Sequence, residues 1–226
     1  MKKSILLGAI AALLAQSSYG TLTYQSSSTT ALGNPVNATA AITISGTSMT
    51  VTLTDLLADP GSVASVLNGI TVNVTGATGA SGLTANAVNT VDLTSGSPVY
   101  GTATGATVAS EFSLSHVGSA ITLSSLGATG PDYLIIGPAG YGSANGSIQS
   151  GPHNPFILGT ATFQFTLSGA GSFSESNLGN LTFLFGTSTD SSTSTKTSSV
   201  PEPSTVLAGA LLLVPLGVQT LRRMRK

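Results

Sequence analysis

Two histidines, His116 and His153, are the side chains best suited to act as a general base near neutral pH. A serine hydrolase would need one of them beside a serine and a carboxylate. His116 lies in a segment with strand-like alternation, and His153 lies in the proline-bounded sequence GPHNP. The chain has no G-x-S-x-G elbow, no paired-carboxylate signature and no phosphate-binding loop. We therefore expect both histidines to be structural or surface residues and the protein not to be an enzyme.

Metal ligands are also sparse in the sequence. The aspartates Asp55, Asp59, Asp92 and Asp132 are scattered, and no D-x-D-x-D-G calcium loop is present. The chain contains no cysteine, which excludes disulfide bonds and thiolate-bound metals. We expect no metal and no cofactor.

One long segment could form a binding loop. Residues 138–155 show neither helical nor strand periodicity, and a loop of this length is either functional or tightly packed on itself. Tyr141, His153 and Asn154 are its candidate binding residues. Tryptophan, which often forms the platform of a sugar-binding site, is absent from the chain.

Most of the remaining sequence alternates between apolar and polar residues, which is typical of half-buried β-strands. The pattern predicts a hairpin from 41–45 and 49–53, and further strands at 22–25, 70–75, 88–93, 98–100, 111–116, 120–123, 132–137, 161–167 and 181–185. Thr54 and Ser62 could each cap a short helix, and residues 76–87 form a Gly-rich loop. We expect an all-β domain at 21–186, a β-sandwich of jelly-roll or immunoglobulin-like kind with one or two short helices. The aromatic-rich strands at 161–167 and 181–185 are expected to form its central core pair.

The C-terminal segment, residues 200–226, has three parts. Val200, Pro201, Glu202 and Pro203 come first, and an uncharged, mainly apolar run at 204–221 follows. The basic residues Arg222, Arg223, Arg225 and Lys226 then end the chain. An apolar run followed by positive charge indicates a single transmembrane helix with its basic end in the cytoplasm. The run is short, and Pro215 interrupts it.

This order of proline-glutamate-proline, short apolar helix and basic end resembles the PEP-CTERM sorting signal of Gram-negative bacteria. The resemblance covers about the last tenth of the chain. It implies that the partner is an exosortase, a membrane-embedded cysteine protease, that cleaves near Pro201–Pro203 and releases the rest of the chain. A plain C-terminal membrane anchor is the alternative.

The N-terminal segment of the chain predicts export. Residues 1–20 combine Lys2 and Lys3, an apolar stretch and small residues up to Gly20, which is typical of a removable signal peptide. Both basic ends then stay inside, and the domain between them crosses the inner membrane. Residues 187–199 consist almost entirely of Ser and Thr, and we expect a flexible stalk there.

The charge distribution limits the partners of the exported part. Charged residues make up 7% of the chain, and no Lys or Arg lies between Ser4 and Thr195. This excludes a basic face for nucleic acid. We expect a protein of the cell surface or extracellular matrix, anchored in the membrane only before processing, with a structural or adhesive role. The alternative is a module that binds matrix exopolysaccharide. A flat, Thr-covered surface would favour the structural role, and a concave face with exposed Tyr and Asn would favour the binding module.

Overall fold

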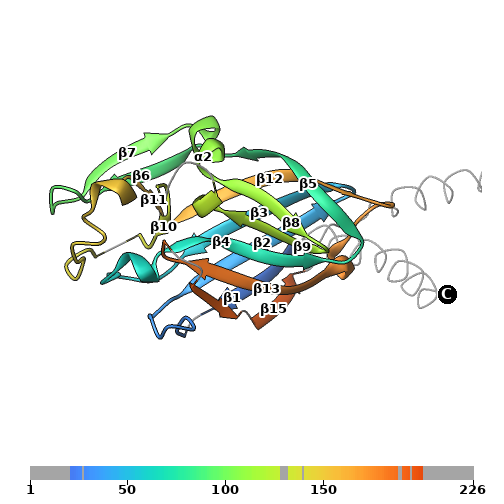
Figure 1. Cartoon of the computed structure of the whole chain (residues 1–226), viewed down its shortest axis with the longest axis horizontal. Helices are drawn as coiled ribbons and strands as arrows, with labels where there is room; N and C mark the ends of the chain where they lie inside the picture. The colour runs from blue at the N-terminus through green and yellow to red at the C-terminus, as the bar shows by residue number, and fades with distance from the viewer. Residues whose placement is uncertain are drawn as a thin grey trace, which may run out of the picture. The chain divides into compact units, whose positions relative to one another are not determined.

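The protein is mostly β, with its strands in two sheets (Figure 1). The computed structural model describes residues 21–26, 28–127, 132–138, 140–187, 190–193 and 195–200. Within them, Leu22–Ser198 forms one compact unit. The predicted β-rich fold class is thereby confirmed.

Sheet one has six strands in the order β15-β1-β2-β3-β12-β5. Their bounds are β15 (Thr195–Val200), β1 (Thr21–Ser26), β2 (Ala38–Ser45), β3 (Ser48–Asp55), β12 (Thr160–Gly169) and β5 (Ala77–Ala85). Strands β2 and β3 form the predicted hairpin, in which Ser45 pairs with Ser48 around a turn at Gly46, whose φ is 63°. Glycine adopts this left-handed conformation without the steric cost of a Cβ.

Sheet two has nine strands, seven of them in the order β14-β13-β4-β10-β11-β6-β7. Their bounds are β14 (Asp190–Thr193), β13 (Leu178–Phe185), β4 (Leu67–Val74), β10 (Ile135–Ile136), β11 (Phe156–Leu158), β6 (Val88–Asp92) and β7 (Val99–Ala103). In addition, β9 (Ala120–Ser124) pairs with β4, and β8 (Ser113–Val117) pairs with β9. The β10–β11 pair is parallel, and the other pairs with a described register are antiparallel.

The helices are short. They are α2 (Gly105–Glu111) and the 3₁₀ turns η1 (Val63–Ser65), η2 (Ser125–Gly127), η3 (Gly151–His153) and η4 (Glu175–Asn177). The predicted cap at Ser62 is confirmed, because its hydroxyl accepts a hydrogen bond from the Ala64 N–H. The predicted cap at Thr54 is wrong, because Thr54 continues β3 and its main chain is paired in sheet one. The α2 helix was not predicted, although Thr104 caps it.

The buried faces of the two sheets share one hydrophobic cluster. Ile42 and Val51 from sheet one belong to this cluster together with Ile70 and Phe183 from sheet two. Strands β2 and β3 alternate between buried and more exposed positions, whereas the first four residues of β4 are all buried. Burial of this apolar surface is the main favourable contribution to folding.

Three strand predictions need correction. The strands at 161–167 and 181–185 do not pair, because β12 lies between β3 and β5 while β13 lies between β4 and β14 in the other sheet. The Gly-rich stretch at 76–87 is mostly strand β5, paired with β12 through main-chain bonds that need no apolar side chains. The strand predicted at 132–137 is reduced to the two residues of β10.

Regular structure also extends into the segment expected to be a stalk. In this segment, β14 pairs with β13 and β15 pairs with β1. Asp190 is buried, and its carboxylate accepts hydrogen bonds from the Leu32 N–H and the Asn34 amide. Main-chain pairing and these bonds hold β14 although it has no large apolar side chain.

The described residues contain no helix that is long and apolar enough to cross a membrane. The predicted signal peptide at 1–20 and the predicted transmembrane run at 204–221 lie outside the described residues. Both therefore stay predictions.

Candidate functional site

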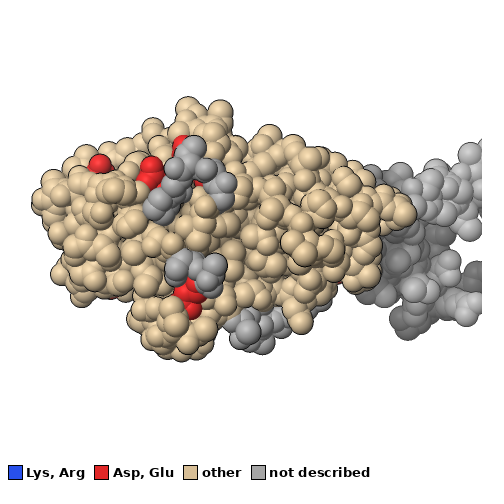
Figure 2. Space-filling model, in the orientation of Figure 1, with Lys and Arg blue, Asp and Glu red and all other residues tan. Residues whose placement is uncertain are grey.

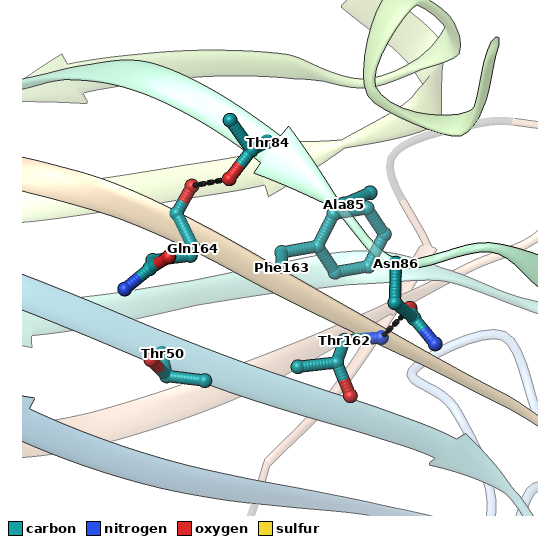
Figure 3. Close-up of a pocket in the computed structure, with 7 residues that line it drawn as sticks. All are labelled: Thr50, Thr84, Ala85, Asn86, Thr162, Phe163 and Gln164. Carbon is teal, nitrogen blue, oxygen red and sulfur yellow. Dashed lines mark hydrogen bonds between the residues drawn. The ribbon is translucent and has the colours of Figure 1, made fainter. Parts of the chain in front are cut away.

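A hollow on the outer face of sheet one is the best candidate site. Its volume is about 260 Å³, and strands β3, β12 and β5 border it (Figure 3). Seven residues line it: Thr50, Thr84, Ala85, Asn86, Thr162, Phe163 and Gln164. The lining contains hydroxyl and carboxamide groups but no charged group.

An irregular pairing of β5 and β12 shapes this hollow. Gln164 pairs with Thr84 and Thr166 pairs with Ser81, so three steps along β5 match two along β12. This β-bulge includes Gly82, whose φ is 71°, and a bulge of this kind bends its strand and increases its twist.

Asn86 continues the ladder beyond the end of β5. Its main-chain N–H donates to the Thr162 carbonyl at 3.0 Å, and its Oδ1 accepts from the Thr162 N–H at 2.8 Å (Figure 3). Its Nδ2 donates to the Ala87 carbonyl at 2.9 Å. The side-chain amide therefore has a fixed orientation at the wall of the hollow.

Two polar groups of the hollow remain available to a ligand. Gln164 is exposed, and its Nε2 donates to the Ser48 hydroxyl at 3.0 Å. Within the described part of the chain, the Gln164 Oε1 and the Thr50 hydroxyl have no hydrogen-bond partner. Phe163 contributes no exposed ring, because its side chain is buried and its ring centroid lies 4.5 Å from that of Phe112.

Threonines cover the sheet around the hollow. Thr52 and Thr162 pair across β3 and β12 with their hydroxyl oxygens 3.0 Å apart, and Thr54 and Thr160 repeat this contact at 3.1 Å. The outward-facing positions of β1, β2, β3, β12 and β5 contain no charged residue. Elsewhere, Figure 2 shows only small, isolated groups of acidic side chains on the face that it presents. The outer face of these five strands is therefore uncharged and rich in hydroxyl groups, while β15, at the edge of the sheet, contains Lys196.

The residues of the predicted binding loop do not line this hollow. Tyr141 is half-buried beside a second hydrophobic cluster that includes Ile148 and Phe156, and its hydroxyl donates to the Gly137 carbonyl at 2.9 Å. Burial, with smaller contributions from Tyr100 and Asp55, raises the pKa of Tyr141 to about 12. This side chain packs the loop onto the fold.

Asn154 has a similar role. Its Oδ1 accepts from the Leu93 N–H at 2.8 Å, and its Nδ2 donates to the Ile148 and Ser150 carbonyls at 2.8 and 2.9 Å. The neighbouring His153 ends η3, and its buried Nδ1 has no hydrogen-bond partner among the described residues. Of the two explanations for a long loop, these contacts favour packing on itself.

Among the described residues, neither histidine side chain has a hydrogen bond to a serine or to a carboxylate. His116 is exposed on β8, with its ring beside Gly79, and His153 lies in the loop before β11. The pKa of Asp132 is raised by burial and by the charge of Glu111, and the charge of His153 lowers it. No group of three or more His, Cys, Asp or Glu able to hold a metal ion occurs within the part of the chain that is described.

No protein-family model, no curated protein and no solved structure matches this chain. The assignment of the candidate site therefore rests on the geometry of this protein alone.

The predicted processing signal falls almost entirely outside the described residues. Val200 is the last residue of β15, whereas Pro201, Glu202 and Pro203 are not described. The same is true of the basic end at 222–226. These residues keep their predicted roles as proposals.

Proposed function

We propose that the protein is an exported β-sandwich of the bacterial cell surface or extracellular matrix, delivered by exosortase-type cleavage near Pro201–Pro203. The supporting observation is the extent of the fold. Its compact unit, Leu22–Ser198, lies between the predicted cleavage positions after Gly20 and near Pro201–Pro203. Cleavage at both predicted sites would leave every described strand in the released protein.

The proposed role of the released domain is structural or adhesive, without catalysis. Outside the hollow, strands β3 and β12 of sheet one present an uncharged, Thr-covered face, and this kind of surface favours the structural role. The shared hydrophobic cluster supports the assignment of the two sheets to a sandwich. Sheet two is mixed, because it contains the parallel β10–β11 pair beside its antiparallel pairs.

Processing can be tested by expressing the full chain in a Gram-negative host that has an exosortase and in an otherwise identical strain that lacks it. The intact mass of the protein from each cell fraction is then measured. We expect a species that begins at Thr21 and ends near Pro201–Pro203 only in the first strain. Digestion with trypsin is unsuitable because no Lys or Arg lies between Ser4 and Thr195.

The double variant Pro201→Ala/Pro203→Ala should retain residues 204–226, because the extended backbone that the prolines impose is lost. Pro152→Ala, at an exposed proline before His153, is the matched control and should be processed normally. Equal retention of residues 204–226 in both strains would leave a plain membrane anchor and contradict the proposal.

Polysaccharide binding is the second candidate function, and the hollow between β3, β12 and β5 favours it. It is compatible with an adhesive role, because a matrix protein must contact the polymer around it.

A further inference from the structure

We propose that the hollow at Thr50, Thr84, Asn86 and Gln164 binds a sugar residue of a neutral polysaccharide, with the Thr-covered face of sheet one holding the adjoining part of the polymer. The inference rests on the proposed extracellular location and does not depend on how the C-terminal segment is processed. It moves the binding site from the loop at 138–155 to the outer face of sheet one.

The chemistry of the hollow matches uncharged sugar hydroxyls. A sugar hydroxyl both donates and accepts hydrogen bonds, and it can donate to the unpartnered Gln164 Oε1 while accepting from the unpartnered Thr50 hydroxyl. The second N–H of the Asn86 amide gives another donor, since only one of its hydrogens is used by the Ala87 carbonyl. The threonine methyl groups provide apolar contact for the C–H groups of a sugar ring.

The absence of charge on the outward positions of β1, β2, β3, β12 and β5 selects against charged polymers. The outward positions of β1, β2, β3, β12 and β5 contain no Lys or Arg to pair with a uronate or a sulfate. They also contain no carboxylate that would attract a protonated amino sugar. A charged sugar would lose part of its hydration here without a charge-assisted hydrogen bond in return.

We expect the ligand of the hollow to be part of a polymer. At about 260 Å³ it is slightly smaller than the ~300 Å³ at the lower end of typical small-molecule sites. Threonine pairs continue from it along β3 and β12, where neighbouring strands lie about 4.8 Å apart and alternate residues about 6.8 Å apart. A chain of linked sugars can contact several of these positions at once, and avidity then increases the weak affinity of a single sugar.

The test is a binding measurement with the full chain in detergent micelles. Binding to cellulose is measured as depletion of the protein from solution by suspended cellulose. Binding to dextran or galactomannan is measured as retardation in gels that contain the polymer. Both are compared with the behaviour of the protein toward alginate, a polyuronate. We expect binding to at least one neutral polymer and none to alginate. Binding to alginate alone, or to none of the four polymers, would overturn the proposal.

The variants locate the site. Gln164→Ala should weaken binding at least about fivefold, and Gln164→Ala/Thr50→Ala should abolish measurable binding. Gln149→Ala, at an exposed glutamine of the loop, and Thr182→Ala, on β13 of sheet two, are the matched controls and should bind as the unaltered protein does. Circular dichroism checks that each variant is folded. Unchanged affinity in the folded double variant would overturn the assignment of the site, whatever the outcome of the processing experiment.

Discussion

The carboxylate of Asp55, at the end of β3 in sheet one, accepts a hydrogen bond from the Leu67 N–H, at the start of β4 in sheet two, at 3.4 Å. Its other oxygen accepts from the Leu57 N–H at 2.9 Å. Asp55 is fully buried, and burial raises its pKa to about 7 despite these two hydrogen bonds, which lower it. A titratable group thus connects the two sheets inside the protein.

The stability of the fold should therefore decrease as the pH rises toward 8. The pKa of Asp55 is higher in the folded protein than the ordinary value of 3.8, so its contribution is fully present below 3.8 and is lost as the pH rises through about 7. At about 1.36 kcal/mol per pKa unit, we expect the free energy of unfolding to fall by about 3 kcal/mol between pH 5 and pH 8. Urea denaturation at several pH values measures this change.

Asp55→Asn tests whether Asp55 causes this pH dependence. Because an amide does not titrate, the free energy of unfolding of this variant should change much less between pH 5 and pH 8. Asp59→Asn is the matched control. Hydrogen bonds from Ser143 lower the pKa of Asp59, so its stabilising effect is lost only at pH values below about 4. A pH dependence that is the same in Asp55→Asn and in the unaltered protein would show that another group is responsible.

Gly69 allows β4 and β9 to approach each other. A Cβ at this position would collide with the Leu123 carbonyl of β9, which is backbone and cannot move aside without disrupting the pairing. We expect Gly69→Ala to lower the free energy of unfolding by more than about 3 kcal/mol or to prevent folding, since overpacking a closely packed core costs about 1–3 kcal/mol even where side chains can adjust. Thermal denaturation followed by circular dichroism is the measurement.

Gly146 provides the comparison, because a Cβ there meets nothing within 4 Å. Gly146→Ala should change the free energy of unfolding by no more than about 0.5 kcal/mol. Similar losses in the two variants would mean that the close contact at Gly69 does not determine the effect.

Phe163 should be a major contributor to the shared core. It has no exposed surface, and its ring packs against that of Phe112. Phe163→Ala is expected to lower the free energy of unfolding by about 3–5 kcal/mol, through lost burial and the cavity that remains. Gln164→Ala changes the adjacent outward-facing residue and should cost less than about 1 kcal/mol. Equal effects at the two positions would contradict the inward orientation of Phe163.

The sequence predicted strands best where every second side chain is apolar. The hairpin at 41–53 and the strand at 161–167 were predicted correctly, because their alternation matches the two faces of a sheet. Strand β5 was not predicted, because apart from Leu83 its residues are Ala, Gly, Ser and Thr, which show no such contrast, and because its position depends on pairing with distant β12. The assignment of strands to sheets also depends on contacts far apart in the chain, which explains the error for 161–167 and 181–185.

The hollow, too, could not have been predicted, because it depends on contacts between residues far apart in the chain. Thr50, Asn86 and Gln164 are far apart in sequence, and the order β3-β12-β5 brings them together. The candidate residues Tyr141 and Asn154 were chosen by type and by the length of their loop, and their hydrogen bonds to the Gly137 and Ser150 carbonyls were not foreseen. Hydrogen-bond partners of this kind leave no pattern in a single sequence.

Asp190 should hold the segment before the predicted processing site against the N-terminal part of the fold. Its carboxylate accepts from the Leu32 N–H at 3.3 Å and from the Asn34 amide at 3.1 Å. Asp190→Ala removes these acceptors, and we expect the free energy of unfolding to fall by about 1–3 kcal/mol. Amide hydrogen exchange should become faster in 30–36 and in β14, because both segments lose their shared anchor. Asp92→Ala is the control and should leave exchange in these segments unchanged. Among the described residues, the Asp92 carboxylate accepts hydrogen bonds only from Thr94, in its own turn. Fast exchange of β14 in the unaltered protein would instead support the flexible stalk expected from its composition.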